Sequence, residues 1–460
     1  TRARKSDARH RLDLRRRPSL TVNGILALFL LIAAACLSTP SQIATCETLD
    51  DAVGPRWSST HYFPRFAAPE KLYALEIPDG YPQSATITLV SLQGIVNRER
   101  PVIYLMFDRF SRFWLSEIQN VTDIPVLRME SGAGLDFVIR EFRTKIRGLV
   151  VYDPSVPDTL NVATTIAGLE DRLIVQPSQV NQYRDKYALS DVLDLRTHVT
   201  ALGWNNENEG RLKLYEWVYN NLWSRVDRRI IGVANPGPPL SKWRATIGVR
   251  EYIVALRLVT LYLNSSDAAQ AKLYAEFLSS APPPAPVFGW ASPEETAVSL
   301  ISSYGHWVPV LSHPFTEYSV IPSNLSVLSG IAPPPVKYRP RVDPQRVIKT
   351  FEPGVYVTAY VTDGDNIGTY DYSLGANQWD VYRNSDVPIG WTINPVLIDI
   401  APIIWNFYVN TAGPQTTLVS GAGAAGYMNP LAMKRSDLLR YLDYARVYWN
   451  ATGIRTAQIA

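Results

Sequence analysis

The chain has 460 residues, of which 46% are hydrophobic and 19% charged, so it holds enough apolar material for packed cores and is not a disordered chain. This length predicts roughly two to four domains. Residues 1–17 hold eight basic and two acidic side chains, and the remainder, with 37 basic and 40 acidic residues, has no basic excess that would favour nucleic acid. Cys36 and Cys46 are the two cysteines, which excludes a disulfide framework or a cysteine-based zinc site in the folded body.

An apolar run at residues 24–37 follows three arginines, Arg15, Arg16 and Arg17. Fourteen helical residues rise about 21 Å, which is short of the roughly 30 Å hydrocarbon core of a bilayer. We therefore predict a basic region and signal peptide within residues 1–46, with a retained membrane anchor or a cytoplasmic basic tail as alternatives. The expected location is extracellular or at the cell surface, with membrane attachment through 24–37 if the run is retained.

Strand and helix patterns alternate from residue 57 to residue 235, which predicts βαβ units and a parallel sheet. We expect this N-terminal α/β region to comprise two subdomains. Its strands are expected at 72–77, 102–106, 125–127, 148–152, 172–175 and 229–233, and its helices at 84–96, 110–119, 137–146, 159–168 and 211–223.

An intermediate domain of helical and α/β character is expected at 236–335, ending at the proline run 333–335. Its helices are predicted at 249–263 and 267–278, and a strand at 287–290. A C-terminal domain is expected at 346–460. Its strands are predicted at 355–361, 389–393, 416–420 and 454–460, and its helices at 396–410 and 431–451. The sequence stops inside the last of these strands, so we expect this domain to be incomplete at its C-terminus.

Polar residues follow the predicted strands of the C-terminal domain. The first strand alternates β-branched and aromatic residues, as a buried strand does, and leads into residues 362–366 with Asp363, Asp365 and Asn366. The strand at 389–393 ends in Asn394. The strand at 416–420 leads into a loop of small residues, which let a ligand or another backbone come close. Because α/β sheets place their chemistry at the C-terminal ends of strands, these loops are the candidate site.

Short segments in the same order along the chain resemble a family called GxGYxYP putative glycoside hydrolase. They are 91–98 with 101–105, 248–252 (with Glu251 for an aspartate), 288–290 with Glu294, 303–305, 324–326, 363–366 and 424–430. The name-giving motif falls on 424–430, where Ala424 stands for the first glycine and Asn429 for the second tyrosine. The resemblance implies α/β N-terminal domains with parallel βαβ units, followed by a (β/α)-barrel-like domain that is truncated here. A barrel of this kind needs about eight strands, and residues 355–460 show about four strand signals.

Glycosidic cleavage needs two carboxyl groups on either side of the bond, and the candidates are Asp363, Asp365 and Glu294. Alternating residues of an extended backbone point to opposite sides, so Asp363 and Asp365 need not share one site. Two other interpretations of these aspartates remain open, an Asx turn that caps a helix and the binding of calcium or magnesium. Glu294 and Glu295 alternatively are acids that favour the N-terminus of a helix.

Sugar hydroxyls are expected to bind polar groups beside these acids, and a sugar face is expected to stack on Trp391 or Trp379, although most tryptophans are core residues. The expected substrate-binding residues are Asn366, Trp391, Asn394, Gly426, Tyr427 and Asn429. His306 and His313 are expected to be structural. We predict no cofactor and no resident metal.

The leading hypothesis is an exported carbohydrate-active hydrolase that acts on a glycan through carboxylates at strand ends. The first alternative is a non-catalytic glycan-binding protein of the cell surface, for which Ala424 and Asn429 argue. The second is a metal-dependent hydrolase of non-glycosidic bonds.

Overall fold

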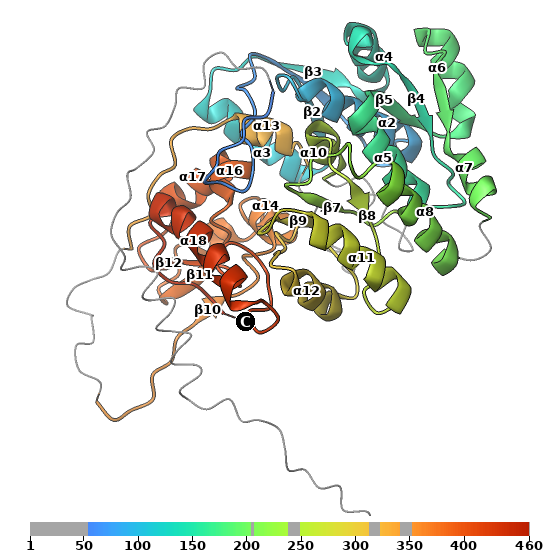
Figure 1. Ribbon diagram of the computed structural model, residues 1–460. Coiled ribbons are helices and arrows are strands. Elements are labelled where there is room, and N and C mark those ends of the chain that lie inside the picture. The colour runs from blue at the N-terminus through green and yellow to red at the C-terminus, as the bar shows by residue number, and fades with distance from the viewer. Residues whose placement is uncertain (1–53, 204–206, 238–248, 312–322, 341–351, 460) are drawn as a thin grey trace, which may run out of the picture. The chain divides into compact units, whose positions relative to one another are not determined.

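The computed structural model describes residues 54–203, 207–237, 249–311, 323–340 and 352–459 (Figure 1). The apolar run 24–37, both cysteines and His313 lie outside these residues. Within them, no helix combines the length and the apolar character that crossing a membrane requires.

Three successive three-stranded sheets form the N-terminal part of the described chain, and every strand pairing in them is parallel. Their orders are β2-β1-β3, β5-β4-β6 and β8-β7-β9, so the first strand of each sheet lies in its centre. The strands are β1 (Leu72–Glu76), β2 (Ile103–Met106), β3 (Val126–Glu130), β4 (Gly148–Val151), β5 (Arg172–Val175), β6 (Val192–Asp194), β7 (Ile231–Val233), β8 (Thr260–Leu261) and β9 (Val287–Gly289).

Helices lie between these strands, as the predicted βαβ pattern requires, and two more, α12 and α13, follow β9. They are α2 (Gln83–Asn97), α3 (Arg109–Val121), α4 (Ser131–Glu141), α5 (Asp158–Glu170), α6 (Val180–Tyr187), α7 (Leu195–Leu202), α8 (Glu207–Asn221), α10 (Arg250–Leu256), α11 (Ala268–Ser280), α12 (Glu294–Ser303) and α13 (Leu325–Gly330), with short 3-10 turns η1 (Arg143–Lys145) and η2 (Pro177–Gln179). Local chemistry sets their ends. Asp108, for example, accepts hydrogen bonds from the N–H groups of Phe110 and Ser111 and so caps α3.

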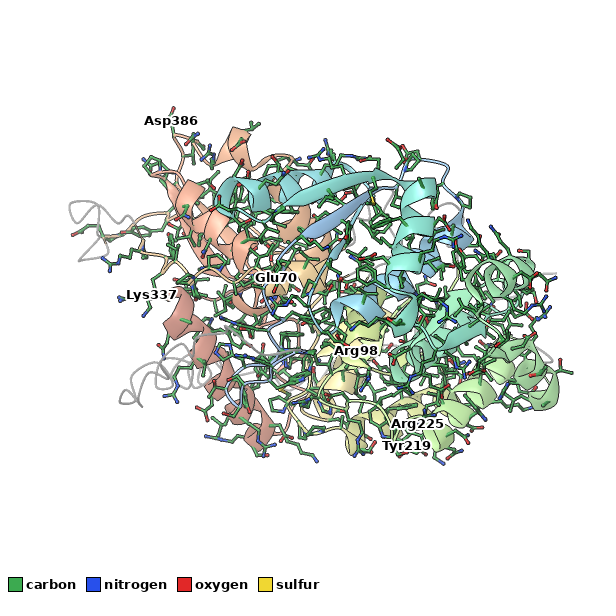
Figure 2. All side chains as sticks on the ribbon, turned by 90° about the horizontal axis from the view of Figure 1, so that it is seen from above. Glu70, Arg98, Tyr219, Arg225, Lys337 and Asp386 are labelled. Carbon is green, nitrogen blue, oxygen red and sulfur yellow. The ribbon has the colours of Figure 1, made fainter. Side chains whose placement is uncertain are left out.

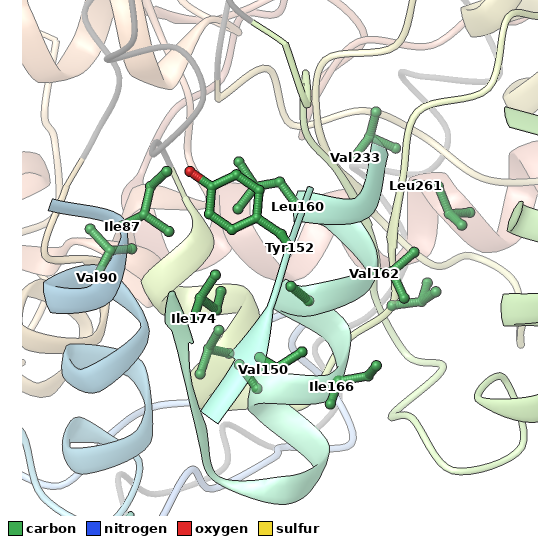
Figure 3. Packing of buried hydrophobic residues seen from close by; sticks show 14 of the residues in the cluster. Ile87, Val90, Val150, Tyr152, Leu160, Val162, Ile166, Ile174, Val233 and Leu261 are labelled. Carbon is green, nitrogen blue, oxygen red and sulfur yellow. The ribbon is translucent and has the colours of Figure 1, made fainter. Parts of the chain in front are cut away.

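The hydrophobic core runs through all three sheets and is centred on α2, α5 and α10. Figure 3 shows aliphatic side chains of α2 and α5 packed against β4 and β5, with Val233 and Leu261 of the third sheet beside α5. Gly94 of α2 lies at the contact with α10. A Cβ atom there would lie 2.5 Å from the carbonyl oxygen of Glu251, so only glycine fits.

The single helix predicted at 249–263 is wrong. α10 ends at Leu256 because Arg257 takes a left-handed backbone conformation, with φ of 56°, and β8 follows at residues 260 and 261. An apolar run alone does not separate a buried helix from a helix followed by a buried strand.

A fourth parallel sheet, ordered β10-β11-β12, forms the centre of the C-terminal domain. Its strands are β10 (Tyr360–Val361), β11 (Ile389–Ile393) and β12 (Thr416–Ser420). Its helical elements are the π-helix η4 (Ile367–Asp371), α14 (Tyr372–Leu374), α15 (Trp379–Tyr382), α16 (Leu397–Ile400), α17 (Pro402–Thr411) and α18 (Arg435–Thr452). The helix predicted at 396–410 is divided into α16 and α17 because Pro402 has no N–H to continue the first of them.

Two strand predictions in this domain are also wrong. The strand expected at 355–361 is formed at Tyr360 and Val361 alone, and residues 352–360 are exposed rather than buried. At 454–460 the described residues form one isolated parallel bridge, between Ser420 and Ala457. The sheet therefore has three strands and one bridged segment in the described residues, and the barrel expected here stays a prediction.

The segment that precedes β1 is hydrogen-bonded to the C-terminal domain. The Nδ1 atom of His61 lies 2.7 Å from an oxygen of buried Asp399, and the hydroxyl of Tyr448 donates to the other oxygen of that carboxylate. The backbone N–H of Tyr62 in turn donates to the Tyr448 hydroxyl. Asp399 is thus a structural residue that joins α16, α18 and the segment before β1.

Candidate functional site

The third N-terminal sheet and the C-terminal domain meet through residues 307–310. Val308 and Tyr427 exchange two backbone hydrogen bonds of 2.8 Å in an antiparallel bridge. Val310 forms a parallel bridge with Asn366. These pairings bring the loops after β10 and β12 against the part of the chain that carries α12.

Asp365 is the central residue of the loop that follows β10. Its side chain is 7% exposed, and burial raises its pKa from the ordinary 3.8 to about 7, helped by the negative charges of Asp363 and Glu294. Asp363 itself is exposed and has a left-handed backbone, with φ of 78°. The two aspartates therefore differ in environment, and Asp365 is the one held as a buried acid.

Close backbone packing holds this loop against the ends of β11 and β12. The N–H of Gly364 donates to the hydroxyl of Thr392, and a Cβ atom at Gly364 would lie 2.1 Å from the backbone carbonyl of Thr392. A Cβ atom at Gly421 would lie 2.5 Å from the backbone nitrogen of Asp365. The small residues of both loops thus let three strand ends converge on Asp365.

Glu294 reaches the same site from another domain. It is the first residue of α12, so the sequence-based alternative of an acid at a helix N-terminus describes its position correctly. Tyr427 lies near the carboxylate of Glu294, and burial, with the charges of Glu294, Asp365 and Glu295, raises the pKa of Tyr427 to about 12. Tyr427 therefore stays a neutral donor, and Asp365, Glu294 and Tyr427 form one cluster, which we call the acid cluster.

A fourth acid, Asp371, adjoins the acid cluster and has no counterpart in the sequence-based predictions. It ends the π-helix η4 and is fully buried. One of its carboxyl oxygens accepts the N–H of Asn394 at 3.1 Å, and the other has no hydrogen-bond partner among the described residues. Burial, with the charges of Asp365 and Asp363, raises the pKa of Asp371 well above its ordinary value. No sequence motif marks this residue, because its environment depends on Asn394, which follows β11 and is distant in the sequence.

The accepting oxygen of Asp371, rather than its charge, is expected to hold the end of β11. Asp371→Asn keeps an oxygen for the Asn394 N–H and removes a buried acid, so it should not lower the free energy of unfolding. Asp371→Leu should be about 1–3 kcal/mol less stable than Asp371→Asn because that N–H loses its acceptor. Urea denaturation of both variants at neutral pH measures the difference. Equal losses in the two variants would show instead that the charge is required.

Asn366 and Asn394 lie beside the acid cluster, as expected, but both are buried. The amide of Asn394 points to the backbone oxygen of Asp365 at 3.5 Å, and its side-chain oxygen accepts the N–H of Val396. The backbone N–H of Asn366 donates to the backbone oxygen of Asp363. In this structure the two asparagines shape the loop around Asp365.

Three other residues expected to bind sugar make structural contacts here, and their role in sugar binding stays a prediction. Trp391 is buried and packs edge-on against Trp379, with ring centres 5.4 Å apart, so neither ring offers a face to a sugar. The side-chain amide of Asn429 donates to the hydroxyl of Ser299. Gly426 is buried where a Cβ atom would lie 2.4 Å from the ring of Trp307.

His306 is structural, as expected, because its two ring nitrogens contact the backbone of Ala285 and Leu278 at 3.0 and 2.9 Å. Among the residues that the structure describes, no group of three or more histidine, cysteine, aspartate or glutamate side chains is placed to hold a metal ion.

The fold and the acid cluster together define a mixed α/β protein with parallel sheets and a carboxyl site at strand ends. Four domain models of one family match the chain. They are the GxGYxYP_N first domain at 71–135, the second domain at 146–226, the third domain at 234–330 and the GxGYxYP putative glycoside hydrolase C-terminal domain at 354–460. The chain belongs to this GxGYxYP family, as the co-linear segments predicted.

A solved structure has the same fold. It is a putative hydrolase from Bacteroides thetaiotaomicron VPI-5482, 22% identical, with a TM-score of 0.69 over 88% of this chain and 73% of the other. No curated protein matches the sequence.

Proposed function

We propose that this protein hydrolyses glycosidic bonds, with Asp365 as the proton donor and Glu294 as the second carboxyl group. One observation carries the proposal. A buried acid at the end of β10, with a pKa of about 7, lies within electrostatic reach of a second carboxyl group from another domain. Glycosidic cleavage uses two carboxyl groups of this kind, with the proton donor in the less polar environment.

The two groups differ as their roles require. With a pKa of about 7, Asp365 is protonated in a large fraction of molecules at neutral pH and can donate its proton to the leaving oxygen. Glu294 is partly exposed and lies near Tyr427, so it can act as a nucleophile or activate a water molecule. In a glycan complex, a carboxyl separation of about 5–5.5 Å would indicate retention of configuration, and about 6.5–9.5 Å inversion.

A panel of glycans tests this function directly. The protein should release reducing ends from at least one glycan, and Glu294→Gln should lower that release about 10²–10⁴-fold. The matched control is Glu276→Gln on α11, a partly exposed glutamate in the domain that carries Glu294, which should be as active as the unchanged chain.

Two outcomes would overturn the proposal in favour of the alternatives. Binding of a glycan without turnover would favour a glycan-binding protein, for which Ala424 and Asn429 argue because they replace a glycine and a tyrosine of the family motif. Activity on other bonds, abolished by a chelator and restored by a divalent ion, would favour the metal-dependent hydrolase. Export, expected from residues 24–37, is a separate proposal, and N-terminal sequencing of secreted material tests it.

A further inference from the structure

A second concave site lies at the opposite edge of the C-terminal sheet. It has a volume of about 490 Å³ and is lined by residues 337–340 and by the C-terminal end of α18 with the residues that follow. The hydroxyl of Tyr338 donates to the backbone oxygen of Thr416, the first residue of β12. Asp365 follows the other ends of the strands. Since a five-residue strand spans about 16 Å, this cavity and the acid cluster are separate sites.

The walls of the cavity are fixed by backbone contacts. The N–H of Tyr338 donates to the backbone oxygen of Thr452 at 2.7 Å. Gly453 ends α18 with φ of 79°, and a Cβ atom there would lie 2.3 Å from the backbone oxygen of Tyr338. The end of α18 and the segment 337–340 therefore cannot separate without breaking this packing.

The charge of the cavity is positive. Lys337, Arg339 and Arg455 line it and are exposed, and none of the lining residues is acidic. None of the three has an ion-pair partner in the described residues. The negative end of the α18 dipole offsets about half a charge, so most of the three positive charges remain uncompensated. Lys337 lies at the periphery of the C-terminal domain (Figure 2).

An aromatic side chain is a second feature of the cavity. Trp449 lines it and is mostly buried. Its indole N–H has no hydrogen-bond partner among the described residues and almost no accessible surface, so a ligand can contact the ring rather than the N–H. The indole also provides apolar surface beside the cations, and the neighbouring Asn450 supplies an amide.

We infer that this cavity binds an acidic sugar, whose sulfate or carboxylate oxygens meet Lys337, Arg339 and Arg455 and whose ring packs beside Trp449. The carbohydrate part of the inference rests on the proposed function, and the anionic part rests on the cavity itself. Such a site would hold an acidic glycan chain at a distance from the acid cluster and restrict the substrates to charged polysaccharides.

Calorimetric titration with a sulfated oligosaccharide, its unsulfated counterpart and inorganic sulfate tests this inference. The sulfated sugar should bind at least about tenfold more tightly than either of the others, and less tightly as salt rises. The double change Arg339→Gln with Arg455→Gln should weaken binding about 10–100-fold, which corresponds to about 1.4–2.7 kcal/mol of binding free energy. Trp449→Phe should weaken it by a smaller factor.

Arg435→Gln is the matched control, an exposed arginine at the other end of α18, and it should bind like the unchanged chain. Asp365→Asn should also bind normally, which separates this inference from the proposed catalysis. Equal affinity for the sulfated and unsulfated sugars, or full affinity in the double variant, would overturn the inference. Sulfate that binds as tightly as the sulfated sugar would show a site for small anions and overturn its carbohydrate part.

Discussion

Asp365→Asn should lower glycan turnover about 10²–10⁴-fold while the fold stays intact, because asparagine fills the same buried space without a proton to donate. The matched control is Asp386→Asn, an exposed aspartate of the same domain, which should leave turnover unchanged. Initial rates on the glycan identified by the panel measure both. An Asp365→Asn variant with full activity would contradict the role of proton donor.

The pH dependence of the same site gives a second measurement. If the protonated form of Asp365 is active, turnover should fall as pH rises through about 7. Asp363→Asn removes a negative charge that raises the pKa of Asp365, so this decline should move to lower pH. A decline that stays in place would show that another group controls it.

Asp365→Asn, which should lower turnover, should raise the free energy of unfolding. In the unfolded chain Asp365 ionises near pH 3.8, whereas in the folded chain it keeps its proton up to about pH 7, so its burial destabilises the fold progressively between these values. Asparagine has no carboxyl group to ionise, so Asp365→Asn removes this pH-dependent loss of unfolding free energy. Relative to the unchanged chain it should gain on the order of 4 kcal/mol between pH 4 and pH 8. Urea denaturation at both pH values measures this gain, and a variant without it would show that Asp365 is not held as an acid.

Gly364→Ala is expected to damage both the fold and the site. The added Cβ atom would lie 2.1 Å from the carbonyl carbon and oxygen of Thr392 and 2.4 Å from the backbone nitrogen of Ile393, and neither contact can be relieved by a side-chain rotation. We expect a loss of about 1–3 kcal/mol in unfolding free energy, as for other overpacked sites. A shift of about 1 Å in the loop should lower turnover about 10²-fold.

The control for this variant is Gly132→Ala in α4, where an added Cβ atom meets nothing within 4 Å. It should be neutral or slightly stabilising, because alanine loses less conformational entropy in a helix than glycine does. Thermal denaturation and glycan turnover of both variants provide the comparison. If Gly364→Ala is as stable and active as the control, the loop is not held by its contact with β11.

The sequence by itself predicted elements whose signal is local. Apolar residues at helical spacing predicted the helix at 84–96, and α2 spans Gln83–Asn97. Alternation of short apolar runs with helices predicted parallel βαβ units, and the described sheets are all parallel. The loop 362–366 was predicted as a candidate site because acids and glycine cannot continue a strand. Each of these inferences depends on residues within a few positions of one another.

The tertiary structure alone decided which of these residues are buried and what they meet. Alternation at 355–361 indicates a strand, but whether anything covers it depends on distant chain, and here residues 352–360 are exposed. Trp391 and Tyr427 carry the same local signal of an aromatic near a strand end. One is buried against Trp379, and the other reaches Glu294, 133 positions earlier in the sequence.

The repeated strand order of the three N-terminal sheets was also invisible in the sequence, since pairing is set by backbone hydrogen bonds that many sequences satisfy. Asp371 shows the same limit in the site. Its burial comes from the packing of η4 against the end of β11, and its raised pKa comes from that burial. Local pattern determines which elements form, whereas the environment of a carboxyl group depends on every segment packed around it.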